Sequence, residues 1–219
     1  MGVKGMWAVN ASALTMLIVV NLALNFASEA LWIVLGLLAL AVTLVFCYRQ
    51  GMNLGHGACG ISNTVESARK AGEKVYAQLD KKYLAQTWSV ATGVKGIFAS
   101  ALIPYAVGGI YIALTMLYQS FPALKVPVII ARVLAWLLSL PYWPIVMHWH
   151  EDFVRLTPAI AAMLLISPFV LPLSTFLGYL RGPKLWQHTE DAMKQGRRRA
   201  KARARVGKKL VPKNQKPEI

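Results

Sequence analysis

The stretch that decides the fold is residues 96–124, which read GIFASALIPYAVGGIYIALTMLYQSFPAL and contain no Lys, Arg, Asp or Glu. An α-helix needs about 20 apolar residues to cross the hydrocarbon core of a bilayer. Three further windows lack charge and a fourth contains only Arg132; they are residues 5–28, 30–48, 156–180 and 126–150. The sequence therefore predicts an all-α integral membrane protein with about five apolar helical segments, of which four span and one can re-enter.

The composition excludes the soluble classes of protein. Hydrophobic residues make up 56% of the chain and charged residues 15%, yet the formal net charge is +15. Soluble enzymes, disulfide-rich secreted modules and disordered chains do not contain repeated uncharged runs of this length. Cys47 and Cys59 lack a partner motif, so we expect neither a disulfide nor a zinc site from them.

The first two windows are close enough to form a helical hairpin. Only a few residues around Ser28 separate them, which leaves room for a tight turn. The small residues there would also suit a signal peptidase, but Lys4 is a weak positive region and the apolar run is long. We therefore expect a retained N-terminal transmembrane hairpin over residues 1–48.

Positive charge sets the expected topology. Residues 49–95 carry seven Lys or Arg against three acids, and residues 181–219 carry thirteen against three. Cytoplasmic segments of membrane proteins carry such an excess. We expect a cytoplasmic loop at 49–95, a C-terminal membrane region at 96–180 and a polybasic cytoplasmic tail at 181–219, with both termini inside and the protein in the cell membrane.

Three apolar windows between that loop and the tail create a parity problem, because three crossings would leave the tail outside. Pro168 and Pro172 interrupt the last window, and Pro141 and Pro144 interrupt the one before it. Proline removes a backbone donor and breaks a helix. Our first expectation is a re-entrant pair of half-helices within 157–180. A break in the preceding window, or two kinked spans, remain alternatives.

The cytoplasmic loop contains the pattern of an amphipathic helix. Asn63 and Glu66 match an N-cap followed three residues later by a carboxylate. Small and apolar residues then recur at helical spacing, namely Val65, Ala68, Gly72, Val75, Leu79 and Tyr83. We expect this helix to rest on the membrane surface or on the protein's own cytoplasmic face.

The tail is the strongest partner signal in the sequence. Thr189 is expected to cap a helix with Glu190 and Asp191 in its first turn. A cluster without any acid follows, formed by Arg197, Arg198, Arg199, Lys201, Arg203, Arg205, Lys208 and Lys209. Self-repulsion is expected to keep that cluster extended until it meets an anionic surface.

Two partners fit the polybasic tail. Anionic lipid headgroups attract each nearby Lys or Arg by about 1 kcal/mol. RNA would be held through its phosphates with strong salt dependence. Because the tail is always tethered beside the bilayer, lipid ranks first, and other membrane-protein subunits are a further possible kind of partner.

The chemically suggestive motifs are weak. Gly55, Gly57 and Gly60 have the spacing of a dinucleotide-binding turn, but no β-strand precedes them, so we interpret them as a flexible exit from a membrane helix. His148, Glu151 and Asp152 are weak metal candidates that lack a third ligand on the same helix face; an interfacial belt is the plainer interpretation. We expect no catalytic residues and no cofactor.

Polar residues within the apolar windows form the last candidate set. Asn21, Asn25 and Glu29 are spaced four apart and share a helix face. Arg132 needs a partner or access to the headgroups, and Glu29 is the acid predicted on that side. A Glu29–Arg132 contact would either hold helices together or, with the two asparagines, form a polar path for a solute.

These observations favour a non-enzymatic structural or accessory membrane protein. Its cytoplasmic amphipathic helix and polybasic tail would engage anionic lipid, RNA or a larger assembly. The alternative is a small transporter or channel subunit that uses the polar path.

Overall fold

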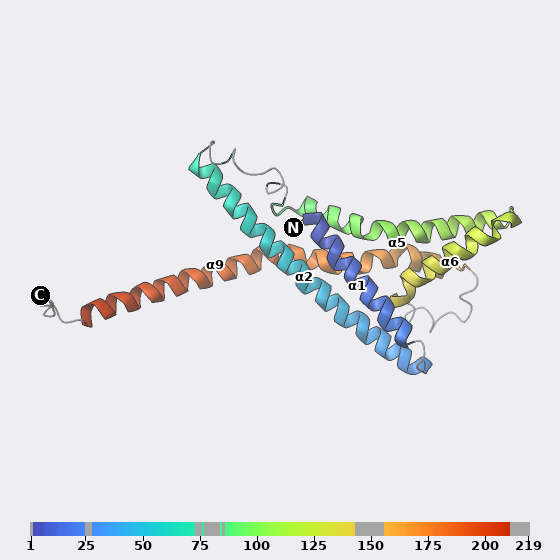
Figure 1. The fold of residues 1–219 in the computed structure, drawn as a ribbon, viewed down its shortest axis with the longest axis horizontal. Coiled ribbons are helices and arrows are strands. Elements are labelled where there is room, and N and C mark those ends of the chain that lie inside the picture. The colour runs from blue at the N-terminus through green and yellow to red at the C-terminus, as the bar shows by residue number, and fades with distance from the viewer. Residues whose placement is uncertain are drawn as a thin grey trace, which may run out of the picture.

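The computed structural model describes residues 2–24, 28–72, 76, 84, 86–142 and 156–210 (Figure 1). The α-helices are α1 (Gly2–Leu24), α2 (Glu29–Ala71), α5 (Val90–Tyr118), α6 (Lys125–Ser139), α8 (Pro158–Ile166) and α9 (Val170–Leu210). Short 3-10 turns are η1 (Pro122–Leu124), η2 (Leu140–Tyr142) and η3 (Ser167–Phe169). There is no strand in these described ranges, which agrees with the all-α prediction.

Five helical segments are long and apolar enough to cross a membrane. They are Gly2–Leu24, Ala30–Ala71, Val90–Tyr118, Pro122–Tyr142 and Pro158–Lys201. Most of their large apolar side chains are exposed in the isolated chain, as lipid-facing side chains are. By length and composition, the chain is therefore a multi-span helical membrane protein.

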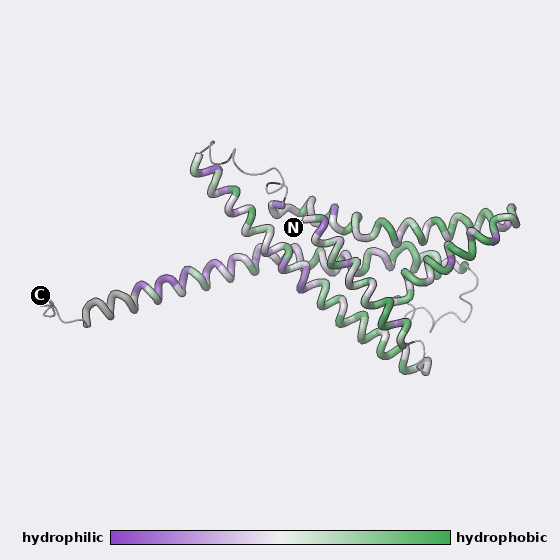
Figure 2. The backbone as a smooth tube through the Cα atoms, in the orientation of Figure 1, coloured by the Kyte–Doolittle hydropathy of each residue, from purple (hydrophilic) through white to green (hydrophobic). Residues whose placement is uncertain are grey.

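The helices form two arms that meet near the middle of the molecule. α1 and α2 run antiparallel as one arm, while α5, α6 and α9 form the other (Figure 1). α2 crosses α9 where the arms meet, and this pair makes the most extensive interhelical interface. Both arms are predominantly apolar, whereas the far part of α9 is polar (Figure 2).

α2 continues far beyond the apolar window and ends at Gly72, whose φ of 122° suits glycine alone. The expected N-cap at Asn63 is wrong, because Asn63 lies inside α2 and its carbonyl accepts from Ser67 Oγ at 2.8 Å.

The flexible exit expected at Gly55–Gly60 is also wrong, since this segment is helical and packs on α9. Val65 and Ala68 of the expected stripe are half-buried.

Only part of the rest of the expected amphipathic helix lies within the described residues. Gly72 is the residue that ends α2. Val75, Leu79 and Tyr83 lie outside the described residues.

The expectation of a re-entrant pair within 157–180 is wrong. Successive positions along α8, η3 and α9 meet successive positions of α5 in the antiparallel sense. A side-chain carbon at Gly108 would touch Leu164, the Phe169 ring lies 5.8 Å from Tyr105, and one at Gly93 would touch Phe176. Pro168 and Pro172 therefore produce a 3-10 turn without reversing the chain.

The segment before it reaches the interior of the bundle at its last described residues. η2 follows α6, and its Tyr142 packs with Ala13, Leu17 and Leu40 in the arm formed by α1 and α2. It also lines a cavity together with Pro104. These contacts lie about midway along α1 and α5, so Tyr142, the last described residue before residues 143–155, lies inside the bundle.

The tail is helical rather than extended as expected. Thr189 is no cap, because it lies within α9 and its Oγ1 donates to Leu185 O at 2.9 Å. Ala, Arg and Lys are good helix formers, and adding residues to a helix that is already formed avoids the cost of nucleation. Lys194 adds an ion pair to Glu190 at 2.9 Å.

Candidate functional site

Three helices are joined by a buried group of polar side chains, which we call the polar junction. It consists of Asn10 on α1, Ser100 on α5 and Thr175 on α9. Thr175 Oγ1 donates to Asn10 Oδ1 at 2.7 Å, and Asn10 Nδ2 donates to Ser100 Oγ at 3.1 Å and to Met6 O at 2.9 Å. Asn10 is 4% exposed and Thr175 0%. Both amide hydrogens of Asn10 are therefore used, which fixes how the three helices meet.

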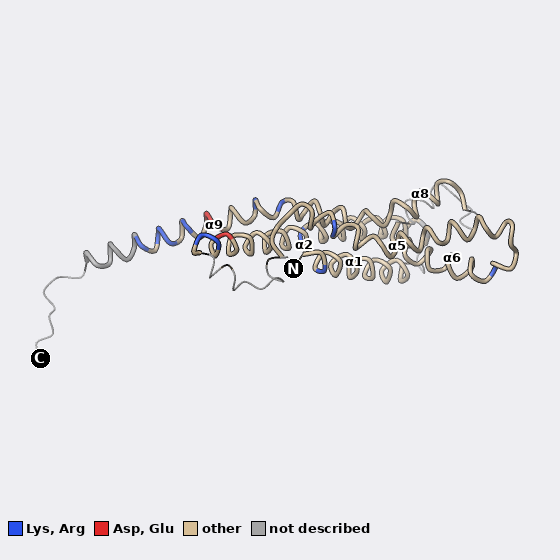
Figure 3. Tube along the Cα trace, turned by 90° about the horizontal axis from the view of Figure 1, so that it is seen from above, with Lys and Arg blue, Asp and Glu red and all other residues tan. Residues whose placement is uncertain are grey.

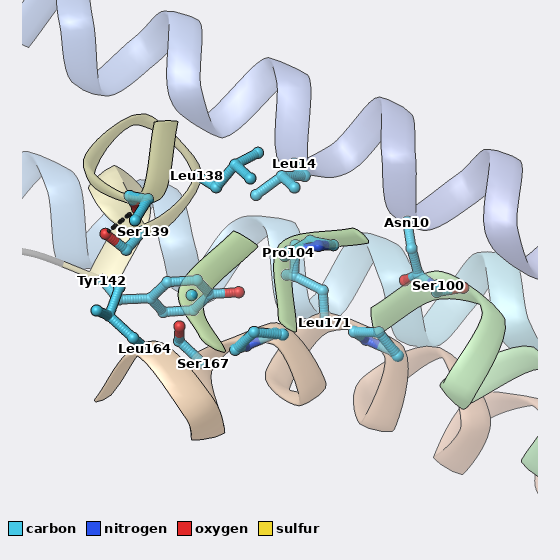
Figure 4. A pocket seen from close by; sticks show the side chains of 14 residues that line it. Asn10, Leu14, Ser100, Pro104, Leu138, Ser139, Tyr142, Leu164, Ser167 and Leu171 are labelled. Atoms are coloured by element: carbon cyan, nitrogen blue, oxygen red, sulfur yellow. Dashed lines mark hydrogen bonds between the residues drawn. The ribbon is translucent and has the colours of Figure 1, made fainter. Parts of the chain in front are cut away.

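Next to the polar junction lies a small cavity, which we call the proline cavity (Figure 4). Its volume is about 30 Å³, which is room for one or two water molecules. Besides Asn10 and Ser100, its polar lining consists of Ser139, Tyr142 and Ser167. Three prolines, Pro104, Pro168 and Pro172, also line it.

The prolines remove regular helical hydrogen-bond donors from the segments beside the cavity. A proline has no N–H, so the carbonyl four residues earlier loses its regular helical donor. The carbonyls affected are those of Ser100, Leu164 and Pro168, and all three residues line the cavity. Leu164 O also faces α5, since a carbon added at Gly108 would lie 3.1 Å from it.

Two hydroxyl groups face the same space. Tyr142 is 5% exposed and Ser167 7%, and Figure 4 shows both hydroxyls directed into the cavity. Within the described residues, no hydrogen bond is made by either hydroxyl. Ser139 differs, because its Oγ donates to Ala135 O at 2.7 Å.

Ten residues farther along α9, two pairs of glycines bring α2 and α9 into backbone contact; we call this the glycine crossing. Gly51 and Gly55 lie on α2, and Gly178 and Gly182 lie on α9. A carbon added at Gly51 would lie 2.8 Å from Thr175 C, and one added at Gly178 would lie 2.8 Å from Tyr48 C. Each pair is spaced four apart, the spacing that lets membrane helices approach closely.

The segment before α5 is fixed against this crossing by Trp88. Its indole Nε1 donates to Tyr179 O at 3.5 Å, and the two rings stack at 6.1 Å. Pro183 removes the regular donor of the Tyr179 carbonyl, so Trp88 replaces it. The backbone N–H of Trp88 donates to Ser62 Oγ at 2.8 Å, and that of Ser89 to Tyr179 Oη at 3.3 Å.

α9 leaves the bundle after Trp186, whose ring lies against Gly60 and 5.1 Å from His56. Beyond it the helix projects alone, and most of its described side chains are exposed. Figure 3 shows Lys and Arg along this projecting part. We call Gln187–Leu210 the basic extension. Arg197, Arg198, Arg199 and Lys201 are exposed on it, while the side chains of Arg203, Arg205, Lys208 and Lys209 lie outside the described residues.

The residues singled out in the sequence fall elsewhere. Asn21 is fully buried and donates to Leu17 O at 2.9 Å, and its Oδ1 has no partner in the described structure. Arg132 is half-buried, with a buried Nε likewise without a described partner. Asn25 and the side chain of Glu29 lie outside the described residues, so the Glu29–Arg132 contact stays a prediction.

The metal candidates His148, Glu151 and Asp152 also lie outside the described residues. Among the residues that are described, no group of three His, Cys, Asp or Glu side chains gathers.

The sequence interpretation missed the polar junction, the proline cavity and the glycine crossing. Two signals were available in the sequence. The Gly51–Gly55 and Gly178–Gly182 pairs have small-residue spacing, and Asn10 is a polar residue within an apolar window. No family model, curated protein or solved structure matches the chain.

Proposed function

We propose that this multi-span membrane protein is a non-enzymatic accessory protein that holds a rigid basic helix in the aqueous phase for an anionic partner such as RNA. The observation that carries this proposal is that α9 runs unbroken from Val170 in the bundle to Leu210. A helix continuous with a membrane segment is aimed by that segment. The bundle therefore sets the direction of the cationic surface.

The length of the basic extension favours a partner away from the bilayer. At 1.5 Å per residue, Gln187–Leu210 reaches about 35 Å beyond the bundle. Attraction to charged headgroups decays over about 8 Å at physiological salt. Most of the cations on a projecting helix would therefore lie beyond the field of the leaflet, which reverses the ranking of lipid over RNA made from the sequence.

The residues between the cations support the same choice. A helix that lies in the membrane interface needs a face of large apolar side chains. Between its cations the basic extension carries mostly small residues, namely Ala192, Gly196, Ala200, Ala202, Ala204 and Gly207. A helix of this kind gains little from insertion and keeps its cations available to phosphates.

The proposal includes a topology with four crossings. α1, α2, α5 and the α8–α9 segment cross, while we assign no crossing to the segment that contains Pro122–Tyr142. The mid-bundle contacts of Tyr142 with Ala13 and Leu17 support this assignment. The basic extension and the α2 end then share one side, as the positive charges require.

The test measures RNA binding by the full-length protein in nanodiscs of neutral lipid. Replacing the four exposed cations by Gln (R197Q, R198Q, R199Q, K201Q) should weaken binding and reduce the salt slope by about 4. A matched variant loses four cations elsewhere (K4Q, R69Q, K70Q, K95Q) and should bind like the parent. Equal loss in both variants would contradict the proposal, as would binding to anionic nanodiscs but not to RNA.

The transporter alternative has less support. The proline cavity has a volume of about 30 Å³, which is too small for most solutes in this conformation. The polar path proposed from Asn21, Asn25, Glu29 and Arg132 stays a prediction.

A further inference from the structure

We propose that the basic extension presents most of its cations as a row along one side of the helix, and that this row binds double-helical RNA through phosphates on the outside of the duplex. The inference rests on the function proposed above and names the form of RNA that the helix fits. It follows from the helical register of the cations, from the residues around them and from the charge density of the partner.

The helical register gathers the cations on one side of the basic extension. Each residue advances an α-helix by about 100°. α9 stays helical to Leu210, so one register holds along the whole extension. Arg199 and Arg203 fall on the other side. What we call the cation row covers about a third of the circumference and consists of the exposed Arg197, Arg198 and Lys201, followed in register by Arg205, Lys208 and Lys209.

Acidic residues set where the cation row begins. Glu190 and Asp191 lie at the base of the extension, and Glu190 is paired with Lys194 at 2.9 Å. The helix then contains no acid from Ala192 to Leu210. A polyanion is therefore repelled at the base and attracted from Arg197 outward.

A one-sided arrangement fits the outside of a duplex better than its groove. A helix that lies in a major groove has a phosphate strand on each flank. The other side of this helix carries Arg199 and Arg203 among small residues such as Ala192, Gly196 and Ala200, and the small residues offer nothing to a phosphate. Contacts from the cation row to phosphates would carry no sequence information.

Charge density favours a duplex over a single strand. The cation row from Arg197 to Lys208 is about 17 Å long at 1.5 Å per residue. A duplex carries one phosphate per about 1.7 Å of its axis, and a single strand one per about 3.4 Å. The same row therefore releases more counterions when it binds a duplex.

The extension also lacks the side chains that hold single strands. Proteins that bind single strands stack the bases on aromatic rings. The sequence contains no Phe, Trp or Tyr after Trp186. A flexible strand would also lose conformational freedom on a rigid helix, whereas a duplex is already ordered.

The test measures binding by the full-length protein in nanodiscs of neutral lipid as the salt concentration is varied. The probes are a duplex RNA longer than the cation row, an unstructured single-stranded RNA of the same length, and a duplex DNA of the same sequence. Duplex RNA should bind roughly tenfold more tightly than the single strand at physiological salt, with a steeper salt slope. Duplex DNA should bind within a few fold of duplex RNA, because the contacts are to phosphates.

A rearrangement at constant net charge tests the cation row itself. Arg197→Gln and Lys201→Gln remove two cations from the row, and Gly196→Lys and Ala200→Lys restore them on the other side. Gly196 accepts a side chain, since nothing lies within 4 Å of its added carbon. The rearranged variant should bind duplex RNA more weakly, with a salt slope reduced by about 2. The matched control exchanges the cations in place, Arg197→Lys with Lys201→Arg, and should bind like the parent.

The outcomes separate this inference from the proposed function. Equal binding of duplex RNA by the rearranged variant and the control would overturn the cation row, as would equal or tighter binding of the single strand, while RNA binding itself would stand. Much tighter binding of duplex DNA would overturn RNA as the duplex. Binding of no RNA by the parent would overturn the proposed function as well.

Discussion

Two regions of the segment formed by η3 and α9, only ten residues apart, show opposite ways of packing apolar helices. At the glycine crossing, Gly178 and Gly182 bring the backbone of α9 against that of α2. At the proline cavity, Pro168 of η3 and Pro172 of α9 line a hollow of about 30 Å³. Glycine removes a side chain and keeps its N–H, whereas proline keeps a side chain and removes its N–H.

The difference shows that one helical segment can be closely packed at one point and leave a hollow at another. In lipid, helix association relies on close packing and interhelical hydrogen bonds. The glycine crossing provides the first of these, and the polar junction beside the cavity provides the second. We expect substitutions to be most costly at the crossing and progressively milder toward the aqueous end of α2.

The largest effect should come from adding a methyl group at the glycine crossing. Gly178→Ala would place a carbon 2.8 Å from Tyr48 C, so the two helices must separate. We expect a loss of about 3 kcal/mol or more in the free energy of unfolding. Gly109→Ala is the matched control, because nothing lies within 4 Å of its added carbon. A loss of similar size at both positions would show that backbone flexibility matters more than the crossing.

The polar junction should give a smaller effect. Thr175→Val keeps the shape of the side chain but deprives Asn10 Oδ1 of its donor. We expect a loss of about 1 kcal/mol in the free energy of unfolding, as for interhelical hydrogen bonds in other membrane proteins. Thr43→Val, which removes only a bond within α2 to Ala39 O, should cost less. The junction would be ruled out if the Thr43 change cost as much.

A substitution at Trp88 tests the hydrogen bond to the Tyr179 carbonyl, whose regular helical donor is absent because of Pro183. Trp88→Phe keeps an aromatic ring against Tyr179 and removes the indole donor, whose bond to Tyr179 O is long at 3.5 Å. The expected loss in the free energy of unfolding is about 0.5 kcal/mol, the low end for a hydrogen bond. Combining it with Pro183→Ala, which restores the helical donor, should cancel most of that loss. Simple additivity of the two changes would argue against this exchange of donors.

The smallest effect should come from the exposed end of α2. Lys70 Nζ lies 2.7 Å from Glu66 Oε1, and this contact lowers the pKa of the Glu66 carboxyl. A lowered pKa in the folded state stabilises the fold above the ordinary carboxyl pKa, and this contribution is lost as the pH falls through the lowered value. Glu66→Gln should therefore slightly flatten the acid side of the stability profile. A large change in the unfolding midpoint at neutral pH would contradict this, since exposed pairs contribute little.

The sequence predicts the membrane helices better than their ends. Uncharged apolar windows follow directly from bilayer thickness, so residues 96–124 were sufficient to establish the class. The signals at Asn63 and Thr189 failed because each lies within a helix that was already established in the bundle, where Asn and Thr need only bond within the helix. Local capping preferences are weak compared with such tertiary packing.

The candidate site could not be predicted from the sequence for a different reason. Asn10 and Thr175 lie 165 positions apart, and no local pattern pairs them. The glycines at 55–60 have the spacing of a nucleotide-binding turn. The spacing that positions the helices is the four-residue spacing of Gly51 and Gly55, which contact the backbone of α9. Proline was correctly predicted to interrupt the later windows, because Pro141 and Pro168 lie in 3-10 turns, but the predicted reversal of the chain at Pro168 does not occur.

The most direct test of the account is the sidedness of three single cysteines in a variant that lacks Cys47 and Cys59. Cysteines would replace Ser67 near the end of α2, Ser120 after α5 and Gln195 on the basic extension, and oriented vesicles would be treated with an impermeant thiol reagent. The account predicts that Ser67→Cys and Gln195→Cys react from the same side, and Ser120→Cys from the other. Reaction of Ser67→Cys and Gln195→Cys from opposite sides would show that the segment containing Tyr142 crosses the membrane fully, and would contradict the proposed four-crossing topology.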